Sequence, residues 1–372
     1  MQLRPEKRLL RYAMTNYSRA LIPLCQCFGG SFPRNPDWTL LLGLSNQTLT
    51  TTHLMPFVQR HRDRIPTDVR HYVSEVFSRN LARNDRLATQ LEEAVLTINE
   101  RGITPTLLKG AAILATSTRA DIGSWMMSDL DIMIPADNVA EAMAALASIG
   151  YKTRFEANPK SNKWYADLGR PMDVGMLDLH RSLPGPAFFY PEAEDLQKHF
   201  KLTRIGRAEA YLPSTTFHAL IMIIHDQFQD YDYWLGAIDL RHLLNLRYLS
   251  SSSEGIDWDA LISLAPDRLA RNALETQLHG LSVLFQADVP QRLRRHFTSR
   301  VQFKRRLAQT RFPILRMALL PLALLDYRNY RAGLGEWHHA NGNDDSRRYI
   351  LPKKKNIRFL IELARRRHVG KV

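Results

Sequence analysis

The sequence is poor in cysteine. Cys25 and Cys27 are the only two among 372 residues. Two cysteines exclude a framework of several disulfides and a four-cysteine zinc site, and no cluster of histidine and cysteine argues for zinc elsewhere. So few thiols fit a reducing compartment, and we expect a cytoplasmic protein.

Two common catalytic motifs are also missing. The sequence contains no Gly-x-x-x-x-Gly-Lys-Ser/Thr phosphate-binding loop. It contains no Gly-x-Ser-x-Gly motif, which positions the nucleophile of many serine hydrolases. Any nucleotide chemistry must therefore use a different arrangement of residues.

No hydrophobic run is long enough to predict a transmembrane segment. The strongly apolar stretch 312–327 is interrupted by Arg316 and Pro321 and falls short of the roughly 20 residues that a membrane span requires. We expect a core helix there. The apolar patch at 20–24 contains Pro23 and lacks a small-residue cleavage pattern, so no signal peptide is predicted.

Acidic residues are scarce towards the C-terminus. The net charge is +14, but residues 292–372 contain 21 Lys and Arg against 5 Asp and Glu, a balance of +16, which leaves 30 against 32, or −2, for residues 1–291. Basic triplets at 353–355 and 365–367 flank an apolar stretch. Three alternatives stay open: the tail contacts an anionic polymer such as nucleic acid, lies on an anionic membrane surface, or packs on the protein with its charges solvated.

The chemistry is concentrated in residues 128–134, Ser-Asp-Leu-Asp-Ile-Met-Ile. On a β-strand, Asp129 and Asp131 share one face while Leu130 and Ile132 share the other. Same-face neighbours lie roughly 6.5 to 7 Å apart, so both carboxylates can converge on one cation. Spacing alone is weak evidence, because three other acidic pairs in the chain have it, at 192 and 194, 230 and 232, and 257 and 259.

The surroundings separate this pair from the others. After the strand, apolar residues at helical intervals predict a helix that ends before Gly150. Upstream, residues 103–108 predict a short strand, followed by Lys109-Gly110 and a small-residue segment at 111–115 that can begin a helix. A glycine at such a helix start lets backbone N–H groups approach an anion.

These motifs resemble the nucleotidyltransferase superfamily typified by DNA polymerase β. The resemblance is greatest to its bacterial branch in which Lys-Gly replaces the usual Gly-Ser, and it spans roughly residues 36 to 250. The sequence Leu-Asp-Leu-His at 177–180 resembles the strand that carries the third carboxylate of that branch. One position departs from the pattern, because Trp125 stands where the family commonly has an arginine, and Arg119 is the nearest upstream substitute.

The resemblance implies a transferase that moves NMP, with ATP as the expected donor among NTPs, to a hydroxyl acceptor on a protein, an RNA or a small molecule. Two Mg²⁺ ions, or Mn²⁺, would be held by Asp129, Asp131 and a third acid. Asp178 is the expected third acid. Asp173 is the alternative, although its odd-numbered offset places it on the opposite strand face unless Gly175 forms a bulge.

Four further residues are expected in the site. Lys109 would pair with triphosphate oxygens, Gly110 would admit the anion to the helix start, and His180 would orient the acceptor or carry a proton. Ser128 would position a phosphate or cap the strand. A second class stays open, in which the acids do not catalyse and the protein is a nucleotide-binding or scaffolding module with a basic tail.

The predicted fold class is α+β, with a small mixed sheet as an α/β catalytic core between helical regions. We expect an N-terminal arm and helical region at 1–100, the core at 101–185, and a C-terminal helical region with a basic tail at 186–372. The change to a period of two after Gly150 predicts further strands at 151–155, 163–168 and 174–180.

Overall fold

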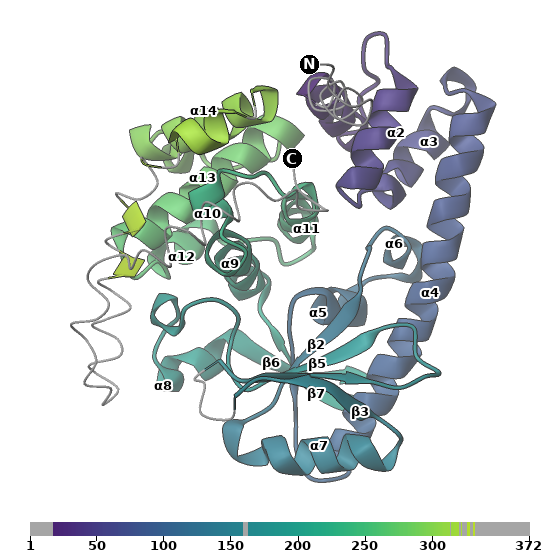
Figure 1. The fold of residues 1–372 in the computed structure, drawn as a ribbon, viewed down its shortest axis with the longest axis vertical. Helices are drawn as coiled ribbons and strands as arrows, with labels where there is room; N and C mark the ends of the chain where they lie inside the picture. Colours follow the sequence, from purple (N-terminus) through teal and green to yellow (C-terminus); the bar gives the residue numbers. More distant parts are fainter. Residues whose placement is uncertain are drawn as a thin grey trace, which may run out of the picture.

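The protein is built on one seven-stranded mixed sheet (Figure 1). The computed structural model describes residues 18–158 and 163–312, together with 314–319, 321, 326–327 and 330–331. The strands run in the order β3-β4-β5-β2-β1-β7-β6, with β2–β5 and β1–β7 parallel and the other neighbours antiparallel. Their bounds are β1 Thr106–Leu107, β2 Asp129–Met133, β3 Lys152–Glu156, β4 Tyr165–Gly169, β5 Met176–His180, β6 Phe200–Ile205 and β7 Ala208–Pro213.

Helices precede, connect and follow these strands. The N-terminal part contains a helix at 18–28, α2 Trp38–Gln47, α3 Met55–Arg60 and the long α4 Thr67–Asn99. Between strands lie α5 Lys109–Thr116, α6 Arg119–Ile122, α7 Val139–Ser148 and α8 Ala193–Leu196. After the sheet come α9 Thr215–Ile224, a π-helical turn His225–Gln229, α10 Asp232–Leu235, α11 Leu240–Ser251, α12 Trp258–Ser263, α13 Arg268–Phe285 and α14 Phe297–Arg311.

This architecture confirms the predicted α+β class, with one correction to the sheet. The sequence predicts only helices after residue 185, yet β6 and β7 form a hairpin there whose second strand pairs with β1. Alternation along β7, where Ala208, Ala210 and Leu212 are buried and their neighbours are more exposed, is the pattern that indicates a half-buried strand. The sheet is therefore larger than predicted.

The two faces of the sheet differ as the strand pattern predicts. Leu130 and Ile132 of β2 are completely buried and belong to a core formed with α4 and α7. In Figure 1, α7 lies below the sheet, whereas the helical regions lie above it. The acidic side chains of β2 therefore face the helical regions, because successive side chains alternate between the two faces.

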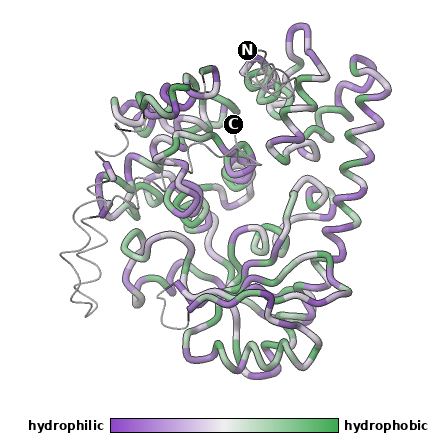
Figure 2. The backbone as a smooth tube through the Cα atoms, in the orientation of Figure 1, coloured by the Kyte–Doolittle hydropathy of each residue, from purple (hydrophilic) through white to green (hydrophobic). Residues whose placement is uncertain are grey.

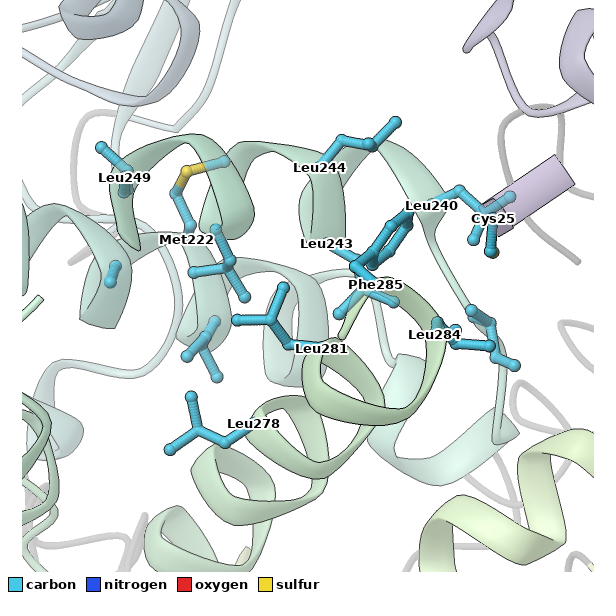
Figure 3. Packing of buried hydrophobic residues seen from close by; sticks show 14 of the residues in the cluster. Cys25, Met222, Leu240, Leu243, Leu244, Leu249, Leu278, Leu281, Leu284 and Phe285 are labelled. Atoms are coloured by element: carbon cyan, nitrogen blue, oxygen red, sulfur yellow. The ribbon is translucent and has the colours of Figure 1, made fainter. Parts of the chain in front are cut away.

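A second core joins the N-terminal helices to the C-terminal ones. Residues 1–35 are predicted to form an arm. In the structure, residues 18–28 form a helix whose Leu24 and Cys25 are buried. Figure 3 shows Cys25 beside Leu240 and Phe285 of α11 and α13. The apolar run 219–224 of α9, green in Figure 2, belongs to the same core. The segment is thus part of the packed structure.

Several predictions concern segments that the structure does not describe. The basic triplets 353–355 and 365–367 and the apolar stretch between them lie outside the described residues, as do residues 313, 320 and 322–325 of the stretch 312–327. Residues 315–319 are helical as predicted, but they are exposed or half-buried, so the prediction of a core helix is wrong for them. Among the residues that are described, no helix has the length and hydrophobicity needed to cross a bilayer.

Two asparagines of α4 hold the segment that leads into β2. Asn84 is fully buried and donates to the carbonyl oxygens of Ile122 and Trp125, both at 2.7 Å. Asn80 donates to Gly123 O and Trp125 O, both at 2.9 Å. Because a loop carbonyl buried without a donor is costly, these side chains fix where β2 begins.

We expect Asn84→Ala to lower the free energy of unfolding by about 1–3 kcal/mol, since it removes a donor from two buried carbonyls. Urea unfolding monitored by tryptophan fluorescence measures the change. Arg79→Ala on the same helix is the control, because Arg79 is exposed and makes only an i, i+4 ion pair with Glu75. Equal stability of Asn84→Ala and Arg79→Ala would contradict the anchoring role.

Candidate metal and nucleotide site

Three carboxylates from adjacent strands form a row on one face of the sheet. Asp131 of β2 lies opposite Asp178 of β5, and Asp178 lies opposite Asp167 of β4. Directly opposed residues on neighbouring strands project from the same face, so the row is contiguous. Asp129 lies two residues before Asp131 and shares its face. The structure therefore brings Asp131 and Asp178 together, as predicted, and adds Asp167.

Lys109 reaches this row from the start of α5. Its Nζ lies 2.5 Å from Oδ1 of Asp131, and the two side chains are only 17% and 4% exposed. The Lys109 backbone has φ +43, a left-handed conformation that is unfavourable for a non-glycine residue. Nε2 of His218 on α9 lies 3.1 Å from the Lys109 carbonyl oxygen. Backbone strain held by its surroundings is typical of functional sites.

His180 approaches the same oxygen from the other side. Its Nε2 lies 3.0 Å from Oδ1 of Asp131, and its ring stacks on Tyr165 with centroids 6.2 Å apart. One oxygen of Asp131 thus has two nitrogen partners, Lys109 and His180. His180 therefore lies beside one of the two aspartates of the predicted site.

The carboxylates respond to this environment in opposite directions. Burial would raise the pKa of Asp131, but the charge of Lys109 and the hydrogen bond with His180 outweigh it, and the pKa is lowered far below its ordinary value. Burial, followed by the charges of Asp129, Asp131 and Asp167, raises the pKa of Asp178 from 3.8 to about 8. Burial would lower the pKa of Lys109, yet Asp131 raises it overall. At neutral pH Lys109 and Asp131 are charged, whereas Asp178 holds a proton.

The residues present fit a divalent cation. Oδ1 of Asp178 is buried and has no hydrogen-bond partner within the described part of the chain. Ligand atoms of Asp131, Asp178 and His180 all lie within 4.8 Å of one another. Asp129 is not in this group, but its charge acts on Asp178, which places it nearby. A cation would supply the positive charge that these oxygens lack.

Arg83 of α4 is a site residue that the sequence analysis missed. Its guanidinium donates to Met127 O and, at 3.0 Å, to Val174 O, which lie just before β2 and β5. Burial lowers its pKa and the nearby charge of Asp129 opposes that shift. No motif marks Arg83 in the sequence, because its position depends on how α4 packs.

Trp125 occupies the position where the family commonly has an arginine, and Arg119 is the nearest arginine upstream. Neither side chain contacts the acidic row. Trp125 is buried and its ring packs edge-to-face against His53 and Tyr248. The side chain of Arg119 is 84% exposed and lies 3.5 Å from Asp85. An arginine does approach the first aspartate, but it is Arg83.

The remaining predicted residues have more local contacts. Ser128 donates to Oδ1 of Asp129 at 3.1 Å. A Cβ atom at Gly110 would lie 3.2 Å from the side chain of Met127, a tight contact that would need Met127 to shift slightly. Asp173 lies outside β5 and its carboxylate accepts two hydrogen bonds from Arg170. Asp173 is thereby separated from the acidic row.

A cavity of about 320 Å³ is lined in part by Trp125. Its lining includes Phe28, Arg60, Arg247 and Tyr248. The lining does not include the acidic row or Lys109. The cavity is therefore distinct from the candidate metal site.

The fold and site together define a class of protein. A mixed sheet with clustered carboxylates on the parallel neighbours β2 and β5, and a lysine at the start of α5, suits a cation and a polyphosphate. A model of the family described as "uncharacterised nucleotidyltransferase" matches residues 34–286, and the chain belongs to this family. Comparisons with curated proteins and with solved structures found no match.

The raised pKa of Asp178 predicts a pH-dependent stability. Between about pH 4 and pH 8 the folded protein binds a proton here that the unfolded chain releases, so this residue makes stability fall as pH rises. Asp178→Asn removes the repulsion. With a chelator at pH 8 we expect its melting temperature to exceed that of the wild type by roughly 2–4 °C, the shift for about 1 kcal/mol.

The advantage should shrink at pH 5, where Asp178 of the wild type is protonated. Asp173→Asn is the matched control, since it breaks the pair with Arg170 and should lower the melting temperature. A variant Asp178→Asn that is less stable than the wild type at pH 8 contradicts the electrostatic interpretation.

Proposed function

We propose that the protein is a Mg²⁺-dependent nucleotidyltransferase that transfers NMP, with ATP as donor, to a hydroxyl acceptor. The observation that supports this most is Asp178 beside Asp131, because its Oδ1 is buried without a hydrogen-bond partner among the described residues and its pKa is raised to about 8. A carboxylate in this state is unfavourable for folding alone and becomes favourable when a cation binds. The family membership supports the reaction class.

Asp129, Asp131 and Asp178 would hold the cations, with Mn²⁺ as a substitute for Mg²⁺. Bound divalent ions supply charge neutralisation at the phosphates and at the attacking oxygen. Asp178 must lose its proton to act as a ligand, so cation binding releases a proton and strengthens as pH rises towards 8. The charge of Asp167 contributes to the raised pKa of Asp178, and burial raises the pKa of Asp167 itself.

Lys109 has two partners in this proposal. Without a cation it neutralises Asp131 at 2.5 Å. With a cation bound to the carboxylate of Asp131, the ammonium group of Lys109 would be available to bind the phosphate oxygens of the NTP. His180 stays beside Asp131 and orients the acceptor hydroxyl or carries its proton.

A second candidate function is nucleotide binding without transfer. It is favoured by the ion pair between Lys109 and Asp131, which satisfies the most buried carboxylate of the acidic row without any cation. In that case Mg²⁺ and ATP bind at equilibrium and pyrophosphate is not released. Pyrophosphate release in the presence of a cell extract as acceptor source separates the two functions.

Asp129→Asn tests the transfer reaction most cleanly. Asp129 is partly exposed, whereas Asp131 is buried and ion-paired, so Asp131→Asn would destabilise the fold by leaving Lys109 buried without its partner. We expect transfer of α-labelled AMP to fall by about 100-fold or more with little change in melting temperature. Asp173→Asn, a carboxylate outside the row, should retain transfer.

Asp178→Asn completes the comparison. It should abolish transfer but retain part of the Mg²⁺·ATP affinity, since Asp129 and Asp131 still hold the ion of the nucleotide. Wild-type turnover in Asp129→Asn, or equal small losses in Asp178→Asn and Asp173→Asn, would exclude the proposed carboxylate mechanism.

A further inference from the structure

A second cluster of ligating side chains lies in the helical region, where α9 ends and α11 begins. Ligand atoms of His225, Asp230 and His242 all lie within 4.8 Å of one another. The charges of Lys109 and Asp131 act on His225, so the cluster lies near the acidic row. The two groups of residues share no member.

The backbone places these side chains in a specific way. His225 and Asp230 are joined by a π-type hydrogen bond, from Asp230 N to His225 O at 3.0 Å, which brings residues five apart onto one turn. His242 lies in the first turn of α11, where its N–H donates to Oδ1 of the N-cap Asp239 at 3.2 Å. A π-turn within a helix frequently marks a functional site.

The distances suit an ion shared by the three side chains better than a direct ion pair between His225 and Asp230. Nε2 of His225 lies 3.9 Å from Oδ1 of Asp230, which is too long for a hydrogen bond. Ligands at about 2.0–2.2 Å from a common tetrahedral ion stand roughly 3.4 Å apart, so a small closing movement is enough. The imidazole rings of His225 and His242 are nearly parallel, with centroids 5.6 Å apart.

Burial and solvent access also suit ligation. The side chain of His225 is only 13% exposed. Nδ1 of His225 is buried and has no hydrogen-bond partner among the described residues. The side chain of Asp230 is 32% exposed, which leaves the cluster accessible from solvent.

We propose that His225, Asp230 and His242 bind a divalent transition-metal ion such as Zn²⁺, separately from the Mg²⁺ site. Two imidazole nitrogens and one carboxylate favour such an ion over Mg²⁺, which prefers oxygen ligands. Three protein ligands leave a coordination position for water.

A competing group, Asp226, Asp239 and His242, is less suitable. Asp239 caps α11 through Arg241 N and His242 N. Asp226 accepts hydrogen bonds from Gln227 and Gln277. Asp226 and Asp239 are also buried, whereas the side chain of Asp230 is 32% exposed, so an ion from solvent reaches the group with Asp230 more readily.

Metal binding by the full-length chain tests the proposal. Chelator-treated protein is titrated with Co²⁺ followed by its visible absorption, and then with Zn²⁺ in competition. We expect about one tightly bound Co²⁺ per chain, displaced by Zn²⁺, and a higher melting temperature in its presence. Asp230→Asn and His242→Asn should weaken Co²⁺ binding by at least about 100-fold.

Two control variants separate this site from others. Asp178→Asn removes a carboxylate from the acidic row and should keep the tightly bound Co²⁺, because Asp178 is not a member of the cluster of His225, Asp230 and His242. His279→Asn removes a histidine of α13 that lies outside the cluster and should behave likewise. Circular dichroism and melting in chelator establish that Asp230→Asn is folded, which its partial exposure favours.

Absence of tight Co²⁺ binding by the wild type overturns the proposal, as does unchanged binding in folded Asp230→Asn. Loss of binding in Asp178→Asn would assign the ion to the acidic row instead. None of these outcomes depends on nucleotide transfer, so failure of this site leaves the proposed activity to its own test.

Discussion

The ion pair between Lys109 and Asp131 is the interaction on which the candidate site depends. Both side chains are largely buried, and each is charged because the other is present. A buried charge without a partner is strongly destabilising. The pair also explains the left-handed backbone at Lys109, since that conformation is maintained where the side chain meets Asp131 and the carbonyl oxygen is within hydrogen-bonding distance of His218.

The acidic row combines this favourable pair with an unfavourable neighbour. Asp131 is neutralised within the protein, whereas Asp178, one strand away, is opposed by three other carboxylates and has an oxygen without a partner. Folding is stabilised by the first arrangement and weakened by the second. Such local conflict between stability and charge is expected where a ligand, and not the protein, completes the electrostatics.

Sequence periodicity predicted the site where it depends on one strand and failed where it depends on packing. Alternation along 129–133 correctly separated the two aspartates from Leu130 and Ile132. Asp178 came from resemblance to a family motif, and its meeting with Asp131 followed from strand register. Asp167 was not predicted because its place depends on the register between β4 and β5. Arg83 was not predicted because its place depends on how α4 packs. No local sequence pattern encodes either of these. The alternation of buried and exposed residues along β7 is visible in the sequence, but the hairpin of β6 and β7 was not predicted.

The helix at 18–28 packs against helices that lie more than 200 residues later in the sequence, so it can reach its native contacts only late in folding. The ring of Phe28 packs against Phe285 at a tilt, and the carbonyl oxygen of Phe28 accepts a hydrogen bond from Arg247, a residue 219 positions later. Contacts so distant in sequence form late, because a long loop must close first. During synthesis the buried face of this helix emerges well before α11 and α13 exist to cover it. A chaperone that shields apolar segments of unfinished chains is therefore expected to bind this helix until α13 has left the ribosome.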